Sequence, residues 1–299
     1  MGLTHVNPIP NDKVERYWPN ANYGNARTLK LFSGYPLDKP IHAVIPHGVF
    51  YEDDHVFPGE AQAPGCSAVL NWPAHRDTVW SQYKEVVPCA APYVYALRTY
   101  PHTRERRGTL VMPQHSTNLY DMDYDWGAFA DLCRDLPRPV TVALYWNDVD
   151  RGAADYFPFK TVCFGHVNQQ AFLERQVLAM TGARHVVSNE IGSYTYYSVL
   201  SGCSFSLFHE PPMMRINNPE FKSVFRDWDD KHPEEQRRMT QMTELFKEWR
   251  DEPNEAQIEA AMYYLRVDAM KDAEGLRSDL EYCEALHKER QAARLCAVH

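Results

Sequence analysis

The chain has 299 residues, a formal net charge of -9, and a composition that is 44% hydrophobic and 24% charged. Such a chain can bury one large core or two smaller ones. The negative charge argues against nucleic acid as a partner, because neutralising phosphates requires a basic face. The seven cysteines show no CxxC and no metal-type spacing, which indicates a reducing compartment.

Residues 1–5 lack the basic and apolar regions of a secretory signal, and no apolar run has the length of a transmembrane helix. We therefore expect a cytoplasmic protein. One basic cluster, Arg98, Arg104, Arg106 and Arg107, is interpreted as a solvated linker. Contact of this cluster with an anionic acceptor or a membrane surface is the alternative, which leaves the inner face of the membrane open as a location. The oligomeric state is not indicated.

The first hundred residues show an incomplete α/β pattern of short apolar runs and helical periodicity. The predicted strands are 41–45, 67–72 and 86–89, and the predicted helices are 25–32, 74–83 and 92–97. Between the first two strands, the acidic and Gly/Pro-punctuated segment 51–65 predicts a loop.

The following region shows a cleaner alternation. The predicted strands are 109–112, 140–145, 161–164, 185–187 and 205–208, and the predicted helices are 126–136, 168–180 and 194–201, with a helical turn near Ala153. Continuous apolar runs between helices indicate a parallel sheet that is covered on both faces. Right-handed crossovers then give a Rossmann-like lobe. From Pro233 onward the chain is charged and helical, with breaks expected near Pro253 and Gly275.

The segment from Ser188 to Tyr197 contains the strongest candidate binding site. An apolar strand, 185–187, runs into Ser, Asn, Gly and Ser residues that open a helix. Backbone N–H groups and the positive end of the helix dipole meet at such a point, which suits a phosphate. Ser193 and Thr195 lie in the first turn and are the best candidates for phosphate contact. Asn189 and Glu190 precede them, and Glu190 could accept hydrogen bonds from ribose hydroxyls.

Three other predicted strands of this lobe also end in polar residues. Ligands of open α/β sheets bind outside the carboxyl ends of the strands, so these residues are expected to meet at one rim. His115 and Ser116 offer an imidazole and a hydroxyl for charge on a departing phosphate, or they form a cap and turn. Asn147 and Asp148 hold a ribose or base edge, or cap a helix. His166 lines the nucleotide pocket, or is a structural histidine.

In the first half, His47 follows a strand in a similar way, and Asp53 lies soon after it. Either side chain could deprotonate an acceptor hydroxyl. Asp53 and Asp54 are a weak signal for a divalent ion, so no metal site is expected. The Walker A, GxGxxG, GxSxG and HExxH patterns are absent, which argues against a kinase, an ATPase or a dehydrogenase.

Six short segments occur in an order that resembles bacterial surface-polysaccharide glycosyltransferases of the GT-B type from capsule and O-antigen clusters. The segments are His47-Gly48-Val49, 91–95, 113–116, 144–148, Gly165-His166 and 188–193. The chain is similar, more loosely, to sialyl- and Kdo-transferases and to CDP-glycerol polymerases. His115 is followed by Ser116 where the sialyltransferase motif has proline.

The resemblance implies an α/β fold with two Rossmann-like lobes and a C-terminal helical segment. Residues 1–105 would form the acceptor-side lobe, 106–232 the nucleotide-sugar-binding lobe and 233–299 the helical segment. A sugar would pass from a CMP- or other nucleotide-activated donor to a glycan or lipid-linked acceptor, with no metal and no bound cofactor. Asn189, Glu190, Ser193, Thr195 and His166 would hold the nucleotide, and His115 and Ser116 the leaving phosphate.

The base would come from the first lobe, from His47 or Asp53. Two other functions stay open. One is a nucleotide-sugar epimerase or hydrolase on the same scaffold, which would turn over donor without an acceptor. The other is a non-catalytic glycan-binding or assembly protein, which would tolerate the loss of His115 and Ser193.

Overall fold

The structure is a computed structural model that describes residues 14–100, 105–117, 120–209, 212–216 and 232–297. Arg104 and the N-terminal residues 1–5 lie outside these ranges. In the part of the chain that is described, no helix combines the length and apolar character that a membrane crossing needs.

The chain divides into two compact units. Where they are described, unit 1 comprises His102–His166 and Arg175–Ala261, and unit 2 comprises Ile9–Pro101, Val167–Glu174 and Met262–His299. Residues of the expected C-terminal helical segment therefore occur in both units. The boundaries drawn at 105 and 232 from the sequence stay a prediction.

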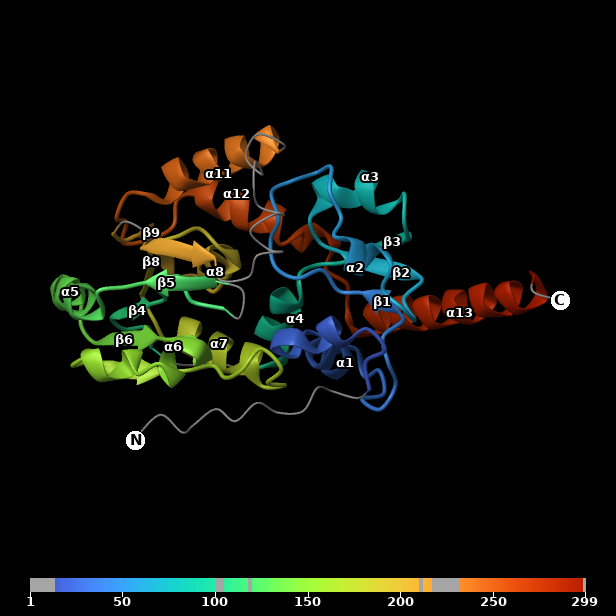
Figure 1. The fold of residues 1–299 in the computed structure, drawn as a ribbon, viewed down its shortest axis with the longest axis horizontal. Coiled ribbons are helices and arrows are strands. Elements are labelled where there is room, and N and C mark those ends of the chain that lie inside the picture. The colour runs from blue at the N-terminus through green and yellow to red at the C-terminus, as the bar shows by residue number, and fades with distance from the viewer. Residues whose placement is uncertain (1–13, 101–104, 118–119, 210–211, 217–231, 298–299) are drawn as a thin grey trace. The chain divides into compact units, whose positions relative to one another are not determined.

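Unit 1 contains a five-stranded parallel sheet with the strand order β7-β6-β4-β8-β9 (Figure 1). Its strands are β4 (Thr109–Val111), β6 (Val140–Ala143), β7 (Lys160–Val162), β8 (His185–Ser188) and β9 (Ser204–Leu207). The chain fills one side of β4 first and then crosses to the other side, which is the order of a Rossmann-like sheet. The predicted Rossmann-like lobe is confirmed.

Helices and an apolar core surround this sheet. The helices are α5 (Trp126–Leu132), α6 (Trp146–Asp150), α7 (Phe172–Thr181), α8 (Ser193–Leu200) and α11 (Pro233–Phe246), and α12 (Glu255–Tyr264) follows. Val111, Val142 and Val187 of three adjacent strands pack with Phe129 and Phe157 in one buried cluster. Residues buried on both faces of a parallel sheet are expected to be β-branched and apolar, as these valines are.

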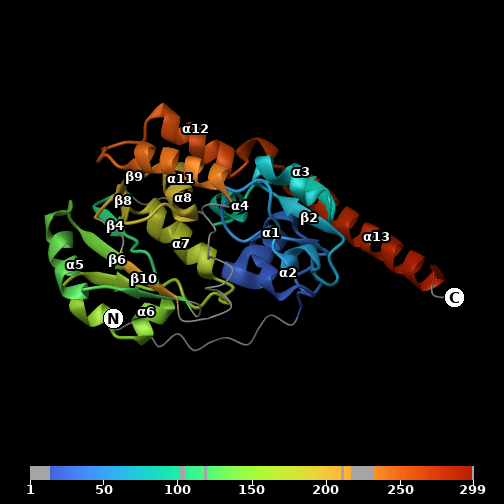
Figure 2. The same cartoon turned by 45° about the horizontal axis from the view of Figure 1, so that its top comes forward.

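Helix α11 covers β9, and both views show them together (Figures 1 and 2). Phe246 at the end of α11 is fully buried, and its ring packs edge-on against Phe205 and Tyr196. The sequence did not predict a second, two-stranded antiparallel sheet in this unit, which pairs β5 (Tyr120–Asp123) with β10 (Met213–Ile216).

Unit 2 contains a three-stranded parallel sheet in the order β1-β2-β3. Its strands are β1 (Ala43–Val44), β2 (Ala68–Asn71) and β3 (Glu85–Pro88), and its helices are α1 (Asn25–Ser33), α2 (Pro58–Ala61), α3 (Asp77–Trp80), α4 (Pro92–Thr99) and α13 (Ala273–Ala297). Val44 and Val69 pack against Trp80 in its core. The predicted mixture of parallel strands and helices is therefore found here as well.

Two details of this unit differ from the prediction. The segment 51–65 is not loop throughout, because Pro58 at the first helical position starts the short helix α2. The expected break near Gly275 lies a few residues earlier, since the chain leaves the α-helical path at 265–272 and Gly275 itself belongs to α13. Gly275 lies in the first turn, and its N–H donates to Asp272 Oδ1 at 2.8 Å, so the glycine is part of a helix cap.

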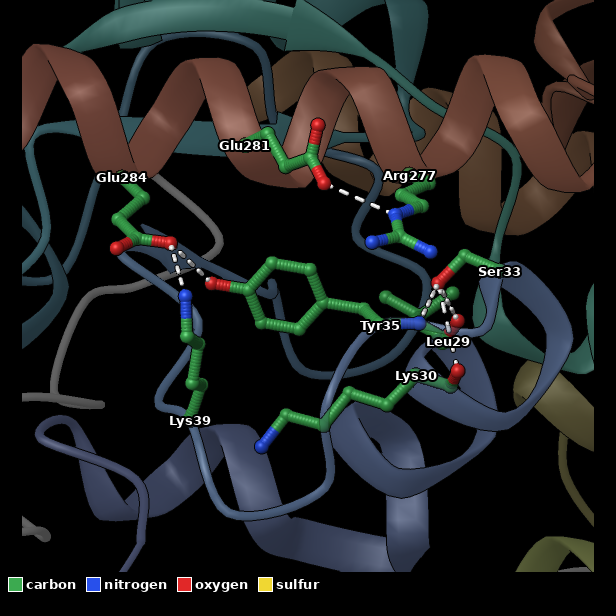
Figure 3. A network of polar contacts seen from close by, with 8 residues as sticks. All are labelled: Leu29, Lys30, Ser33, Tyr35, Lys39, Arg277, Glu281 and Glu284. Carbon is green, nitrogen blue, oxygen red and sulfur yellow. Dashed lines mark hydrogen bonds and ion pairs between the residues drawn. The ribbon is translucent and has the colours of Figure 1, made fainter.

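Helix α13 is tied to the segment that follows α1 through Glu284 (Figure 3). Its Oε2 accepts a hydrogen bond from the Tyr35 hydroxyl at 2.9 Å and forms an ion pair with Lys39 Nζ at 3.4 Å. The Ser33 hydroxyl donates to the Leu29 carbonyl at 2.7 Å, which closes the end of α1. The contacts of Glu284 fix one side of α13 against the segment that follows α1.

A buried ion pair lies beneath the same helix α1. Lys30 Nζ and the Glu15 carboxylate are bonded, with side-chain exposures of 2% and 0%. The second oxygen of Glu15 accepts from the Ile41 N–H at 3.0 Å, just before β1. Both charged groups are therefore compensated where they are buried, as folding in a low dielectric requires.

Candidate functional site

The candidate site lies at the carboxyl edge of the five-stranded sheet in unit 1. The register pairs Val111 with both Val142 and Val187, so the loops after β4, β6 and β8 leave the sheet at one level. Strand order reverses between β4 and β8, and open α/β sheets bind ligands in the crevice at this switch point. The predicted convergence of the strand ends is found at this edge.

Asn189 joins the loops that leave β8 and β4. Its Oδ1 accepts the Gln114 N–H at 2.8 Å, and its Nδ2 donates to the Tyr124 hydroxyl at 2.8 Å. The same hydroxyl donates to the Gln114 carbonyl at 2.9 Å. Asn189 is only 3% exposed, so these bonds hold the two loops together in a water-poor environment.

The side-chain amide of Gln114 has a buried oxygen that could accept a hydrogen bond from a ligand. Its Oε1 is buried and accepts no hydrogen bond from the described residues. A buried acceptor without a donor costs free energy, and it is satisfied when a ligand brings a hydroxyl or an N–H.

Glu190 follows Asn189, and its carboxyl belongs to a second set of hydrogen bonds. The Tyr194 hydroxyl, on the first turn of α8, contacts Glu190 Oε1 at 3.0 Å and Ser188 Oγ at 2.9 Å. Burial raises the pKa of Glu190 to about 7, and the hydroxyl of Tyr194 opposes this rise. The carboxyl can therefore gain or lose a proton near neutral pH.

Asp148 is a second buried carboxyl at this edge. It lies in α6 after β6, and its Oδ2 accepts the Ser116 N–H at 3.2 Å. Burial raises its pKa to about 6, while the hydroxyl and N–H of Ser116 and the more distant Arg151 oppose the rise. Ser116 Oγ also accepts the Met122 N–H at 3.0 Å, so this hydroxyl connects the β4 loop to β5.

Two tyrosines link the carboxyls electrostatically. Burial, together with the nearby Glu190, Tyr145 and Asp148, raises the pKa of Tyr120 to about 12. Tyr124 also has a raised pKa from burial, with the same two carboxyls adding to it. The hydroxyls remain protonated donors at neutral pH. The site thus combines two carboxyls with a set of tyrosine hydroxyls.

His115 stacks on Tyr145, with ring centroids 4.0 Å apart. Its Nδ1 lies 3.2 Å from the Ser116 carbonyl, which can only accept, so Nδ1 carries the proton in this bond. Burial lowers the pKa of His115, which favours the neutral ring. In this state Nε2 presents a lone pair, and donation to a phosphate would need the imidazolium. The predicted phosphate role stays a prediction.

His166 lies at the end of the segment that follows β7. Gly165 before it has φ +112°, a conformation that glycine adopts readily. The His166 ring is 4.4 Å from the Trp146 ring, and burial lowers its pKa. The indole Nε1 of Trp146 is buried without an acceptor among the described residues. Asn147, the next residue of α6, is 7% exposed.

The two predicted phosphate-binding hydroxyls, of Ser193 and Thr195, have different surroundings at the start of helix α8. Thr195 is 0% exposed, and its Oγ1 accepts the Gly192 N–H at 3.2 Å, which caps the helix. Ser193 is the first helical residue and is half-buried. The cap gives Thr195 a structural role, and phosphate contact for either hydroxyl stays a prediction.

The two first-half candidates belong to unit 2. His47 is exposed and stacks on Tyr23, with centroids 5.0 Å apart. Asp53 is half-buried in the loop after β1. Its neighbour Glu52 is buried and contacts Arg76 at 3.4 Å. In the described part of the chain, no group of three or more His, Cys, Asp or Glu side chains is arranged to hold a metal. Metal independence stays a prediction.

The sequence interpretation missed Gln114, Tyr124 and Tyr194. Gln114 and Tyr194 lie inside segments that were recognised as strand endings, so a wider reading of those segments would have included them. Tyr124 lies ahead of α5 and reaches Asn189 across 65 positions, and no local pattern indicates this contact.

No protein-family model matches the chain, and no curated protein matches its sequence. Among solved structures the chain is similar to the pneumococcal O-GlcNAc transferase GtfA in complex with UDP and GlcNAc, at 12% identity and a TM-score of 0.34 over 84% of this chain and 52% of that one. It is also similar to the GtfA/B complex, at 14% identity and a TM-score of 0.28 over 80% of this chain and 54% of that one. The chain spans about half the length of these proteins.

Proposed function

We propose that the chain is a glycosyltransferase that takes a sugar from a nucleotide-activated donor. The donor would bind at the carboxyl edge of the five-stranded sheet in unit 1. The acceptor would be a glycan or a lipid-linked molecule, and the reaction would belong to the synthesis of a bacterial surface polysaccharide. The sugar would be activated by CMP or by a nucleoside diphosphate. Transfer would need neither a metal nor a bound cofactor.

The observation that carries this proposal is the bonded pair of loops at the switch point. Gln114, Tyr124 and Asn189 join the loops after β4 and β8 at the position where open α/β sheets bind ligands. The loop after β8 continues into α8, whose first turn can receive a phosphate through its N–H groups and dipole. A phosphate placed there would lie next to the two joined loops.

The side chains around this point suit a ligand with many hydroxyls. Glu190 and Asp148 can accept from ribose or sugar hydroxyls, and the Tyr120 hydroxyl can donate. Gln114 Oε1 adds a buried acceptor that has no partner among the described residues. A site built to bond hydroxyls discriminates strongly against ligands that lack them, because its polar groups are then left unpaired.

His115 would lie beside the phosphate. In its neutral form, Nε2 would accept a proton. Only the protonated ring could donate to the phosphate and stabilise the charge on the leaving group. His47 or Asp53 of unit 2 would deprotonate the acceptor hydroxyl. Asn147 and His166 would line the nucleotide, and Ser193 would contact its phosphate, next to the turn that Thr195 caps.

The test is a thermal-shift panel with CMP, CDP, UDP and GDP on the full chain. Ligand binding to the native state raises its stability, so one nucleotide is expected to raise the melting temperature selectively. The same nucleotide should shift Asn189→Ala much less, because that variant separates the two loops. Glu244→Gln, an exposed change on α11, is the control and should respond like the wild type.

The outcomes separate the candidate functions. No response to any of the four nucleotides overturns the nucleotide-sugar proposal. With the responding nucleotide known, its sugar derivative is supplied with and without a glycan acceptor. Turnover without an acceptor indicates a hydrolase or an epimerase, and binding that persists without any turnover indicates a non-catalytic protein. Acceptor-dependent release of the nucleotide supports the transferase.

A further inference from the structure

The amino edge of the three-stranded sheet in unit 2 gathers basic side chains. His42, Ser67 and Lys84 are the residues directly before β1, β2 and β3, so the parallel sheet places them along one edge. Helix α13 passes this edge and packs on β2 (Figure 1). From α13, His287 and Arg290 reach the same edge.

Three consecutive backbone carbonyls, of residues 65–67, contact these basic side chains and fix their positions. His42 Nδ1 contacts the Gly65 carbonyl at 2.9 Å, Lys84 Nζ donates to the Cys66 carbonyl at 2.8 Å, and Arg290 donates to the Ser67 carbonyl at 2.9 Å. The turn at 65–67 thus anchors three basic side chains from three different elements. Lys84 is 8% exposed, so its position is set by the fold and not by solvent.

Two stacked histidines complete the arrangement. The rings of His42 and His287 lie 4.4 Å apart and nearly parallel, at 15°. His287 Nδ1 contacts the Ser67 hydroxyl at 3.2 Å. His287 and Arg290 are three residues apart and Arg294 is four residues further, so the three project from one face of α13.

Among the residues that the structure describes, no carboxylate forms an ion pair with this cluster. Burial is the largest cause of the lowered pKa of His287. The neighbouring groups His42, Arg294 and Arg16 lower this pKa further. Burial, Arg290 and Arg294 likewise lower the pKa of Lys84, against the nearby Cys66 thiol. In the described ranges, none of Arg16, Arg290 and Arg294 forms an ion pair with a carboxylate, although the chain as a whole is acidic.

The neighbouring carboxylates do not neutralise the cluster. Glu85 and Glu289 adjoin Lys84 and Arg290 in the sequence and are exposed, and neither pairs with these cations. Glu284 is held by Tyr35 and Lys39 (Figure 3) and also pairs with Lys288. Glu15 is bonded to Lys30.

We propose that this basic cluster, formed by Arg16, His42, Lys84, His287, Arg290 and Arg294, binds a phosphate group. The group is a phosphomonoester or a pyrophosphate, carried by a soluble metabolite or by a lipid headgroup. The guanidinium groups of Arg290 and Arg294 can bond two phosphate oxygens each, and Lys84 adds positive charge from the sheet edge. The site belongs to unit 2 and does not depend on the nucleotide site proposed for unit 1.

The experiment is calorimetric titration of the full chain with inorganic pyrophosphate at low ionic strength. We expect binding that weakens at least tenfold in Arg290→Ala/Arg294→Ala. The matched control is Arg277→Ala/Lys288→Ala, which removes two positive charges from the same helix at residues already paired with Glu281 and Glu284. The control should bind like the wild type. Each variant is exposed on α13, so the fold should be retained.

A second arm distinguishes the two sources of the phosphate. Sedimentation with phosphatidylcholine vesicles that contain phosphatidic acid, compared with pure phosphatidylcholine, reports a lipid headgroup. Binding to phosphatidic acid that is lost in Arg290→Ala/Arg294→Ala identifies the lipid, and pyrophosphate binding without vesicle binding identifies a soluble ligand.

A third variant separates this site from the one in unit 1. Ser193→Ala should leave pyrophosphate binding at the basic cluster intact. The proposal is overturned if the wild type binds neither probe, if the control double variant weakens binding as much as Arg290→Ala/Arg294→Ala, or if only Ser193→Ala removes binding.

Discussion

Two buried carboxylates of this protein have opposite surroundings. Glu15 of unit 2 is bonded to Lys30, which is almost completely buried with it. Glu190 of unit 1 is bonded to the Tyr194 hydroxyl and contacts no cation of the described residues. A buried carboxylate with a cation is stabilised as an ion, whereas one surrounded by hydroxyls keeps its proton to higher pH.

The difference separates a carboxylate with a structural role from one that can take part in binding or catalysis. The Glu15–Lys30 pair joins α1 to the segment before β1 and satisfies its own charges, so it needs no ligand. The Glu190 carboxyl titrates near pH 7 at the edge of the sheet where ligands bind, and a ligand can change its state. Buried acids without a cation are therefore the better guide to a functional site in this fold.

The largest expected effect comes from removing the cation of the paired carboxylate. Lys30→Met leaves Glu15 buried and uncompensated, which should lower the free energy of unfolding by about 3–5 kcal/mol. Urea denaturation at pH 7 measures this loss. Lys39→Met, which breaks an exposed pair with Glu284, should cost about 0.5 kcal/mol or less. Equal losses in both variants would show that the buried pair has no special role.

The second effect is on ligand binding at the unpaired carboxyl. Glu190→Gln keeps the shape but loses the charged acceptor, so it should weaken the nucleotide found in the thermal-shift panel by about 10- to 100-fold. Isothermal titration of that nucleotide gives the value. The control Glu244→Gln should leave the dissociation constant unchanged. An unaltered constant in Glu190→Gln would place the ligand away from this carboxyl.

The third effect is on the pH dependence of stability. The pKa of Glu190 is raised from 4.5 to about 7, so the folded state holds a proton that the unfolded state has released. Its contribution is complete below pH 4.5 and is lost as pH rises to about 7, by about 3 kcal/mol. Urea unfolding of wild type and Glu190→Gln across this range should show a shallower decline in the variant. Parallel curves would contradict the raised pKa.

The smallest effect concerns the hydroxyl that contacts Glu190. Tyr194→Phe removes a donor to the carboxylate, which should raise the pKa of Glu190 further, by less than one unit or about 1 kcal/mol. Carbon-detected NMR titration of the Glu190 carboxyl follows this shift. Tyr156→Phe, a change at an exposed ring, serves as the control. A fall in the pKa after Tyr194→Phe would reverse the proposed direction of this hydrogen bond.

The sequence was sufficient for the parallel sheet of unit 1 and for its polar rim. Its central strands β4, β6 and β8 are short and mostly apolar, because burial on both faces removes the need for alternation. The polar residues after β4, β6 and β8 then converge for topological reasons alone. The C-terminal helices were also expected, although the break lies a few residues before Gly275, because a capped first turn tolerates glycine.

What the sequence could not provide depends on contacts between distant residues. Tyr124 meets Asn189 only because β5 and α5 fold back over the sheet edge, and β5 pairs with β10 across about ninety positions. The raised pKa values of Asp148 and Glu190 also have no local signal, since burial causes them. Whether His47 or Asp53 acts as a base is likewise decided by surroundings that no short motif records.

The acid-rich edge of unit 1 has a thermodynamic consequence for any ligand that docks there. At neutral pH the Glu190 carboxyl is close to half protonated, so a ligand that approaches it changes its proton occupancy. Protons then pass between protein and buffer in each binding event. The observed heat of binding would include the ionisation enthalpy of the buffer, and a comparison of PIPES and Tris solutions would count the protons that accompany the ligand.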